Sequence, residues 1–165
     1  MARATRRTRS GGRAAPPEGE LAGLEAALGH RFDDPAILVS ALAHSSLGGR
    51  PTDSNRFDRL EFLGDRVIGL VVAELLLARY PEDAEGDIAR RHARLVNRDS
   101  LARLARAIDL GRYLQLSPGE AQSGGRDNPA VLADAFEAVT AALYRDGGMA
   151  PARTFLAARF APLVA

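Results

Sequence analysis

The 165-residue chain contains no cysteine, no tryptophan and no lysine. Without cysteine it forms no disulfide and offers no thiolate to a metal, which fits a reducing compartment, and we expect a cytoplasmic protein. Its three histidines, His30, His44 and His92, are not spaced as metal ligands usually are. Any bound metal must therefore be held by oxygen atoms, which favours a hard cation.

Long hydrophobic runs are also missing. The most apolar stretch, 67–78, is twelve residues long, is interrupted by Glu74 and lies between Arg66 and Arg79. A membrane-spanning helix needs about 20 apolar residues. The stretch is typical of a buried core helix, and we expect no membrane as a partner.

Charge is unevenly distributed along the chain, although the net charge is only +1. Residues 1–17 contain five arginines and no acid, so the remainder carries 17 basic against 21 acidic residues, a net of −4. The segment 1–17 lacks the apolar centre of a signal peptide, and we interpret it as a disordered arginine-rich tail rather than a targeting signal. The remainder, 18–165, has the length of one domain. Its acids fit either a metal site or an ordinary solvated surface.

Apolar periodicity, capping residues and helix breakers predict an all-α fold, and no segment alternates as a half-buried strand does. Asp34 and Pro35 are typical of a helix start, while Asp53 and Ser54 are the expected caps of the longest helix, which Pro81 ends. The expected helices span 18–28, 35–44, 56–80, 84–97, 99–108, 129–145 and 151–160, with a connector at 111–116 and a loop at 117–128.

The longest predicted helix carries three acids near its start. At 100° per residue, Asp58, Glu61 and Asp65 fall within about 60° of one another. The same face continues with Ile68 and Val72, so the acids lie on a stripe that leads into the core. A solvated acidic face would carry basic partners one turn away, whereas Glu61 has Asp65 at that spacing.

A second pair of acids lies on the helix predicted over 129–145. Asp134 and Glu137 are three residues apart, and each has an alanine at i+4. Carboxylates about 5 Å apart repel by roughly 3 kcal/mol at an effective dielectric of 20, so protons or a cation must relieve the repulsion. Two helices with two acids each can supply the oxygen ligands that Mg²⁺ prefers, and such an ion supports phosphodiester hydrolysis.

The block DRLEFLGDRVI at 58–68 is very similar to the signature of the ribonuclease III family, usually written ERLEFLGDSVL. Four further blocks resemble the family in the correct order, and the likeness covers the chain from about residue 21 onward. They are ALAHSS (41–46), EGDIARRHARLVN (85–97), LSPGEAQSGG (116–125) and LADAFEAVTAALYRDGG (132–148), the last resembling LADTFEALIGAIYLDGG.

This resemblance implies an all-α endonuclease domain that works as a homodimer on double-stranded RNA, with Mg²⁺ as cofactor and Mn²⁺ able to substitute. Each subunit would cut one strand, leaving 5′-phosphate and 3′-hydroxyl ends with short 3′ overhangs, in the processing of rRNA precursors and some mRNA. Asp65 and Glu137 match the pair most tied to catalysis, and Asp58 and Glu85 match two further acids near the cleft. The positions that match the metal-holding carboxylates are Glu61, Asp65, Asp134 and Glu137.

The chain departs from the family pattern in three ways. Asp58 replaces the usual glutamate and is one methylene shorter, which puts direct metal ligation there in doubt. Ala43 stands where threonine is common, which removes a hydroxyl. Bacterial members typically continue into a double-stranded-RNA-binding domain, and no such domain is included in this chain, which ends at Ala165. We favour an excised catalytic domain over a naturally short form.

Two features of the longest predicted helix point to close packing. Gly64 lies in its interior, where glycine costs about 1 kcal/mol relative to alanine. We expect another helix or a partner subunit to approach the backbone there. Apolar side chains nearly ring the start of this helix, which suggests a dimer seam in addition to core packing. They are Phe57, Leu60, Phe62 and Leu63.

Three further groups allow weaker predictions. His44 is expected to cap a helix end rather than to catalyse. Arg90, Arg91 and Arg94 either contact phosphates, which would make binding salt-dependent, or pair with nearby acids. The segment 123–125 is expected to be a flexible loop that can meet RNA.

Two other classes of protein compete with a nuclease. A binding protein that keeps the fold without the chemistry would have lost at least one of the four matching acids, and all four are present. A di-iron helical bundle needs Glu-x-x-His pairs, and no histidine lies three residues after a glutamate. The nuclease reading is therefore preferred.

Overall fold

A computed structural model describes residues 18–48 and 51–165, and this part of the chain is helical without a β-strand. The predicted all-α class is confirmed, while the arginine-rich segment 1–17 lies outside the described residues. The helices, in chain order, are α1 (Glu18–Leu28), α2 (Pro35–Leu42), η1 (Ser45–Leu47), α3 (Pro51–Arg79), α4 (Glu85–Leu95), α5 (Arg98–Ala107), η2 (Leu110–Tyr113), α6 (Pro118–Gln122), η3 (Gly125–Asp127), α7 (Pro129–Gly147) and α8 (Met149–Val164).

The start of α3 differs from the prediction. The helix begins at Pro51 instead of residue 56, so Asp53 and Ser54 lie inside its first turns and the prediction that they cap it is wrong. A proline fits the first helical position because its φ angle is already helical and its missing N–H has no partner there in any case.

Three other segments are more helical than predicted, and the first is the expected connector 111–116, which begins with η2. The expected loop 117–128 contains α6 and η3, because Ser117 caps α6 by accepting a hydrogen bond from the Glu120 N–H at 3.2 Å. The last helix, α8, extends two residues before and four residues after the predicted range 151–160. It begins directly after Gly148, whose φ of 81° lets the chain turn from α7 into α8.

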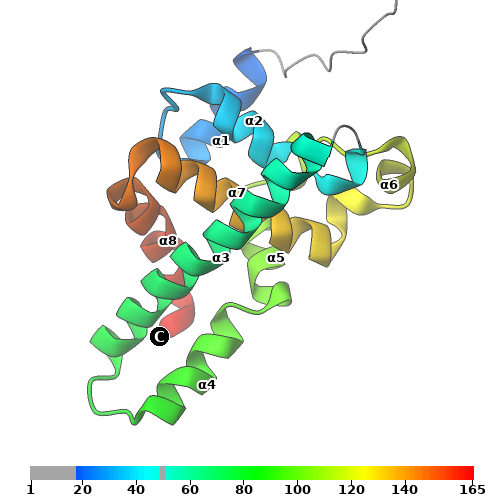
Figure 1. Ribbon diagram of the computed structural model, residues 1–165. Helices are drawn as coiled ribbons and strands as arrows, with labels where there is room; N and C mark the ends of the chain where they lie inside the picture. Colours follow the sequence, from blue (N-terminus) through cyan, green and yellow to red (C-terminus); the bar gives the residue numbers. More distant parts are fainter. Residues whose placement is uncertain (1–17, 49–50) are drawn as a thin grey trace, which may run out of the picture.

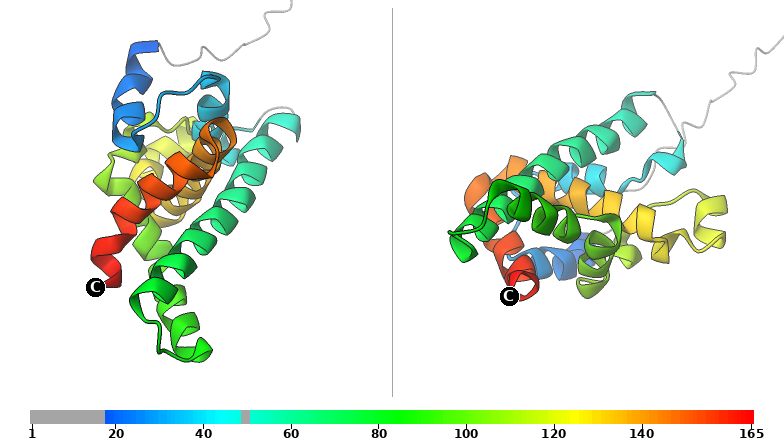
Figure 2. Two further views of the ribbon diagram at one scale, coloured as in Figure 1. Left: turned by 90° about the vertical axis from the view of Figure 1, so that its left-hand side faces the viewer. Right: turned by 90° about the horizontal axis from the view of Figure 1, so that it is seen from below.

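Helix α7 forms the centre of the domain and packs against α2, α3, α5 and α8. In Figure 1, α3 runs diagonally across the front of α7, and the two further views in Figure 2 show α8 beside α3. The most extensive contact between two helices joins α3 and α7. The core is therefore organised around the helix that carries Asp134 and Glu137.

The second half of α3 forms a hairpin with α4 at one end of the molecule, where α8 lies beside α3 (Figure 1). The hairpin is tied to the C-terminal end of α8, because the Tyr80 hydroxyl donates to the carbonyl of Val164 at 2.7 Å. Within the described ranges, the structure contains no helix that is long and apolar enough to cross a membrane.

Asp146, near the end of α7, holds the linker between α1 and α2 in place. Its carboxylate lies 2.7 Å from the Nε2 atom of His30 and accepts hydrogen bonds from the N–H groups of Asp33 and Asp34. Only 4% of its side chain is exposed. A buried carboxylate needs such partners, and they fix α2 against the end of α7.

Candidate metal centre

The central helix α7 is buried on nearly all sides and interrupted by one polar stripe. Between Val131 and Leu143, every residue is buried except Asp134 and Glu137. Asn128 starts the helix by accepting hydrogen bonds from the N–H groups of Ala130 and Val131. The three-residue spacing then puts both carboxylates on the face that meets α3.

Helices α3 and α7 are in close backbone contact where they cross. A Cβ atom on Gly64 would lie 1.8 Å from the carbonyl oxygen of Glu137 and 2.4 Å from its carbonyl carbon. The predicted close approach at Gly64 is thus confirmed, and the approaching element is α7 of the same chain. Because no other residue leaves this space, Gly64 brings Glu61, one turn earlier on α3, up to the acids of α7.

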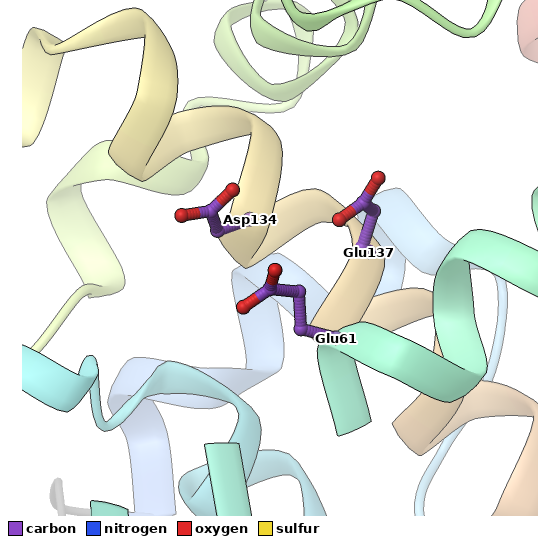
Figure 3. Close-up of side chains that lie close together, drawn as sticks. All are labelled: Glu61, Asp134 and Glu137. Atoms are coloured by element: carbon purple, nitrogen blue, oxygen red, sulfur yellow. The ribbon is translucent and has the colours of Figure 1, made fainter. Parts of the chain in front are cut away.

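Three carboxylates converge at this crossing. Glu61 of α3 and Asp134 and Glu137 of α7 each offer one oxygen atom, and these atoms all lie within 4.8 Å of one another. Figure 3 shows the three side chains close together at the crossing, Glu61 on α3 and Asp134 and Glu137 on α7. Within the described part of the chain, none of the three forms an ion pair with a basic residue. We call Glu61, Asp134 and Glu137 the carboxylate cluster.

The pKa values of the cluster show that its negative charge is not compensated. Burial, followed by the charges of Asp65, Glu61 and Asp134, raises the pKa of Glu137 to about 8 despite an opposing effect of Arg66. Burial and the neighbouring acids, Asp134 first, also raise the pKa of Glu61. A bound cation would offset both the burial and the repulsion that raise these pKa values.

The pKa of Asp134 is raised as well, with burial again the largest cause. The imidazole of His44 and the guanidinium of Arg98 oppose this rise, while Asp58 adds to it. His44 and Arg98 therefore act on Asp134 and partly offset the effect of burial on its pKa. Arg98 was not identified from the sequence, because it belongs to no recognised block and reaches the cluster only through the placement of α5.

His44 has the predicted capping role. Its Nδ1 atom accepts a hydrogen bond from the Ser46 N–H at 3.1 Å at the start of η1. The backbone is held to the η2–α6 connection by hydrogen bonds on either side of an isolated bridge between Ala43 and Gln115.

The other predicted site residues lie outside the cluster. Asp65 is one turn beyond Glu61, but its side chain is 51% exposed and forms an ion pair with Arg66 at 2.6 Å. Asp58 is exposed and acts on the cluster through its charge. Glu85 begins α4, beyond the far end of α3, and the helix from Glu61 to Arg79 alone covers about 27 Å. Within one chain, Glu85 cannot reach the cluster.

The arginines of α4 are partly engaged with acids. Arg90 pairs with Asp87, and Arg91 pairs with Asp83 at 2.9 Å while its guanidinium lies 3.9 Å from the centre of the Tyr80 ring. No ion pair of Arg94 is found among the described residues. Of the two predicted alternatives, pairing with nearby acids therefore holds for Arg90 and Arg91. The guanidinium N–H groups of Arg94 remain available for contacts with phosphates.

The outer face of α3 carries exposed apolar side chains. Phe57 and Leu60 are buried in the core, whereas Phe62 is 62% exposed. Phe62 lines an open groove of about 1170 Å³ between α2, α3 and the end of α7. Other residues that line the groove include Ile37, Ser40, Arg56, Leu63 and Arg145.

Comparison with known proteins gives one consistent result. The family model described as Ribonuclease-III-like matches residues 34–163. A protein named Ribonuclease 3 from Azorhizobium caulinodans is 51% identical over 130 residues, which are 78% of this chain and 55% of that protein. Another Ribonuclease 3, from Aromatoleum aromaticum, is 46% identical over 89% of this chain and 63% of its own length. The chain thus spans little more than half of these relatives.

A solved structure agrees with the sequence relatives in fold. The nuclease domain of ribonuclease III from Campylobacter jejuni is 36% identical, with a TM-score of 0.80, and the match covers 86% of this chain and 96% of that domain. Its description mentions a region involved in dimer formation. The matched residues include both helices of the carboxylate cluster. The protein described here is therefore a member of the ribonuclease III family.

Proposed function

We propose that this domain is a divalent-metal-dependent endoribonuclease that hydrolyses phosphodiester bonds in double-stranded RNA. The observation that carries the proposal is the convergence of Glu61, Asp134 and Glu137 from two helices, with no ion pair to a basic side chain in the described part of the chain. Family membership supports the same activity, since relatives over most of this chain bear the name Ribonuclease 3.

The residues at the crossing fit a hard divalent cation. Three carboxylate oxygens from a partly buried site match the oxygen ligands of Mg²⁺, and Mn²⁺ accepts the same ligands. When bound, such an ion lowers the pKa of a bound water and stabilises charge on phosphate oxygens. We propose Glu61, Asp134 and Glu137 as direct ligands, with Asp65 as the fourth carboxylate of the site.

The residues of the site and its surroundings have different proposed roles. The backbone of Glu137 lies against Gly64 on the buried helix α7, so this residue would hold a bound ion from a fixed point of the helix crossing. Asp65 and Glu137 together are proposed as the catalytic pair. Arg98 and His44 add donors on the Asp134 side, where they can contact the phosphate next to the cleaved bond.

We further propose that the domain acts as a homodimer. The exposed ring of Phe62 and the groove that it borders lie on the same face, so a twofold axis can place each phenylalanine against the other subunit's groove. Each subunit would then cut one strand, which leaves short 3′ overhangs with 5′-phosphate and 3′-hydroxyl ends. Asp58 lines this groove and Glu85 is remote within one chain, so neither is proposed as a direct ligand of its own subunit's metal.

The proposed substrate is duplex RNA recognised by its shape. Contacts to phosphates and 2′-hydroxyls carry little base information, so we expect low sequence specificity and steep salt dependence. Arg94, with its donors available on α4, is one candidate for such contacts. Processing of rRNA precursors and some mRNA in the cytoplasm is the cellular role that we propose.

Cleavage of a long RNA duplex tests the function directly. We expect products with Mg²⁺ and none with excess chelator, and Glu137→Gln should lower the rate by about 100-fold or more because it removes a ligand charge. The matched control is Glu74→Gln, an exposed glutamate on α3 that pairs with Arg153. Sequencing of the product ends checks the end chemistry. Duplex binding without metal-dependent products would instead indicate a non-catalytic RNA-binding protein.

Sedimentation velocity tests the dimer. We expect Phe62→Ala to weaken self-association by about 30-fold, as the loss of a central aromatic contact typically does. Leu163→Ala, which removes an exposed apolar side chain of α8, is the control and should leave association unchanged. Equal behaviour of the two variants would contradict an interface at Phe62.

A further inference from the structure

Arg66 makes a set of contacts that the proposed function does not use. Its Nη1 atom donates to Oδ2 of Asp65 at 2.6 Å and to the carbonyl of Phe62 at 3.4 Å. Its guanidinium carbon lies 3.8 Å from the centre of the Phe62 ring. One exposed arginine therefore joins an aromatic side chain of α3 to the carboxylate that the family resemblance assigns to the metal site.

Asp65 lies close to the carboxylate cluster without being part of it. It is one helical turn beyond Glu61, and residues at this spacing share a face. Among the neighbouring charges that raise the pKa of Glu137, that of Asp65 acts most strongly, ahead of Glu61 and Asp134. Yet among the residues that the structure describes, only Glu61, Asp134 and Glu137 bring their oxygens within 4.8 Å of one another. What separates Asp65 from the cluster is the direction of its side chain, which is turned to Arg66.

We propose that Arg66 is a positioning residue that holds Asp65 outside the cluster until a cation binds, and so raises the metal concentration at which the site fills. The inference rests on the proposed metal-dependent function. The family signature written above, ERLEFLGDSVL, has serine at this position, and a serine could not reach Asp65 in the same way. Arg66 therefore gives this chain a competitor for one carboxylate of its own metal site.

The strength of this competition follows from the exposure of the pair. Arg66 and Asp65 are 57% and 51% exposed, and such pairs are weak because water screens them. The stacking on Phe62 restrains the guanidinium and reduces the entropy lost on pairing. A pair of this kind shifts a competing equilibrium by about two- to fivefold. A divalent cation can therefore displace Arg66, but only at a higher concentration.

Calorimetric titration with Mn²⁺ at low ionic strength, without RNA, tests the inference by affinity rather than by activity. We expect Arg66→Ser to bind Mn²⁺ about two- to fivefold more tightly than the unchanged protein. Arg91→Ser is the matched control, because Arg91 also pairs with an acid, Asp83, and lies 3.9 Å from the centre of an aromatic ring, that of Tyr80, beyond the end of α3 that is far from the cluster. This control should bind Mn²⁺ as the unchanged protein does.

A second pair of proteins separates positioning from simple loss of positive charge. In an Asp65→Asn background, Arg66 has no carboxylate to hold, so Arg66→Ser should no longer change the affinity. If Arg66→Ser raises the Mn²⁺ affinity equally in the unchanged and Asp65→Asn backgrounds, or raises it in neither, the inference is overturned while the proposed metal site stands. If the unchanged protein binds no Mn²⁺, the proposed function itself fails and the inference fails with it.

Discussion

Two regions of α3 carry acids in quite different surroundings. On the hairpin side, Glu74 forms a two-point ion pair with Arg153 of α8 at 3.0 and 3.1 Å, and Asp83, just after α3, pairs with Arg91 at 2.9 Å. At the crossing with α7, Glu61 and Glu137 lie among other acids and have raised pKa values. The first region is a solvated surface that balances its own charge, and the second can be balanced only by protons or a cation.

The comparison shows what distinguishes a ligand site from an acidic surface. The number of acids is similar in both regions, so composition does not separate them. The difference is that the carboxylates at the crossing are partly buried and form no ion pair among the described residues, whereas Glu74 and Asp83 each have an arginine partner. Each prediction below changes one region and leaves the other unchanged.

The largest effect is expected where the two helices touch. Gly64→Ala puts a methyl group where the backbone of Glu137 already lies, and the helices must separate. We expect a loss of about 3 kcal/mol in the free energy of unfolding, as for severe overpacking, measured by urea denaturation. Gly86→Ala on α4 is the control, since its Cβ would meet only the Arg90 side chain at 3.6 Å. Equal stability of the two variants would show that α3 and α7 are not in backbone contact.

An intermediate effect is expected from pH in the absence of metal. The pKa of Glu137 is about 8 in the folded protein and near 4.5 in the unfolded chain, so between these values the folded state binds more protons. Stability must then fall as pH rises from about 4.5 to 8. Glu137→Gln cannot ionise and so avoids this loss of stability. We expect the variant to be more stable than the unchanged protein at pH 8 by about 1–2 kcal/mol, a value that allows for solvent screening of the carboxylate.

Thermal or urea unfolding in the presence of chelator, at pH 5 and pH 8, measures this difference. The gain of Glu137→Gln should be small at pH 5 and should also shrink at pH 8 when Mg²⁺ is added, because the cation then stabilises the ionised carboxylate. A gain that is the same at both pH values would mean that Glu137 titrates normally and that the cluster is not electrostatically strained.

The smallest effect is expected in the balanced region. Glu74→Gln breaks the ion pair with Arg153, whose partners are 46% and 48% exposed, and we expect a loss of less than about 1 kcal/mol. Addition of 0.5 M NaCl should make the difference in the free energy of unfolding between Glu74→Gln and the unchanged protein still smaller, since salt screens exposed ion pairs. A loss as large as that of Gly64→Ala would mean that the hairpin depends on this pair and that the contrast between the two regions is wrong.

Much of the local structure could be predicted from the sequence, because helices follow from apolar periodicity and from breakers within a few residues. The helix predicted to start at residue 129 begins there as α7. The start of α3 was missed because Asp53 and Ser54 are good caps by residue type, while Pro51 offered a better start two residues earlier. Such competition between neighbouring helix starts is decided by the surrounding chain.

Residue spacing placed Glu61 on one helix face and Asp134 and Glu137 on another, and the presence of a glycine in a helix interior identified Gly64 as a point of close approach. That these faces meet within one chain was decided by tertiary structure, since only packing of α3 on α7 puts a glycine against the carbonyl of Glu137. Tertiary structure also decided that Asp65 turns to Arg66, that Glu85 lies far away, and that Arg98 acts on Asp134. The physical reason is range: a helical repeat relates residues a turn apart, whereas a carboxylate cluster depends on which helices are neighbours and how closely their backbones approach.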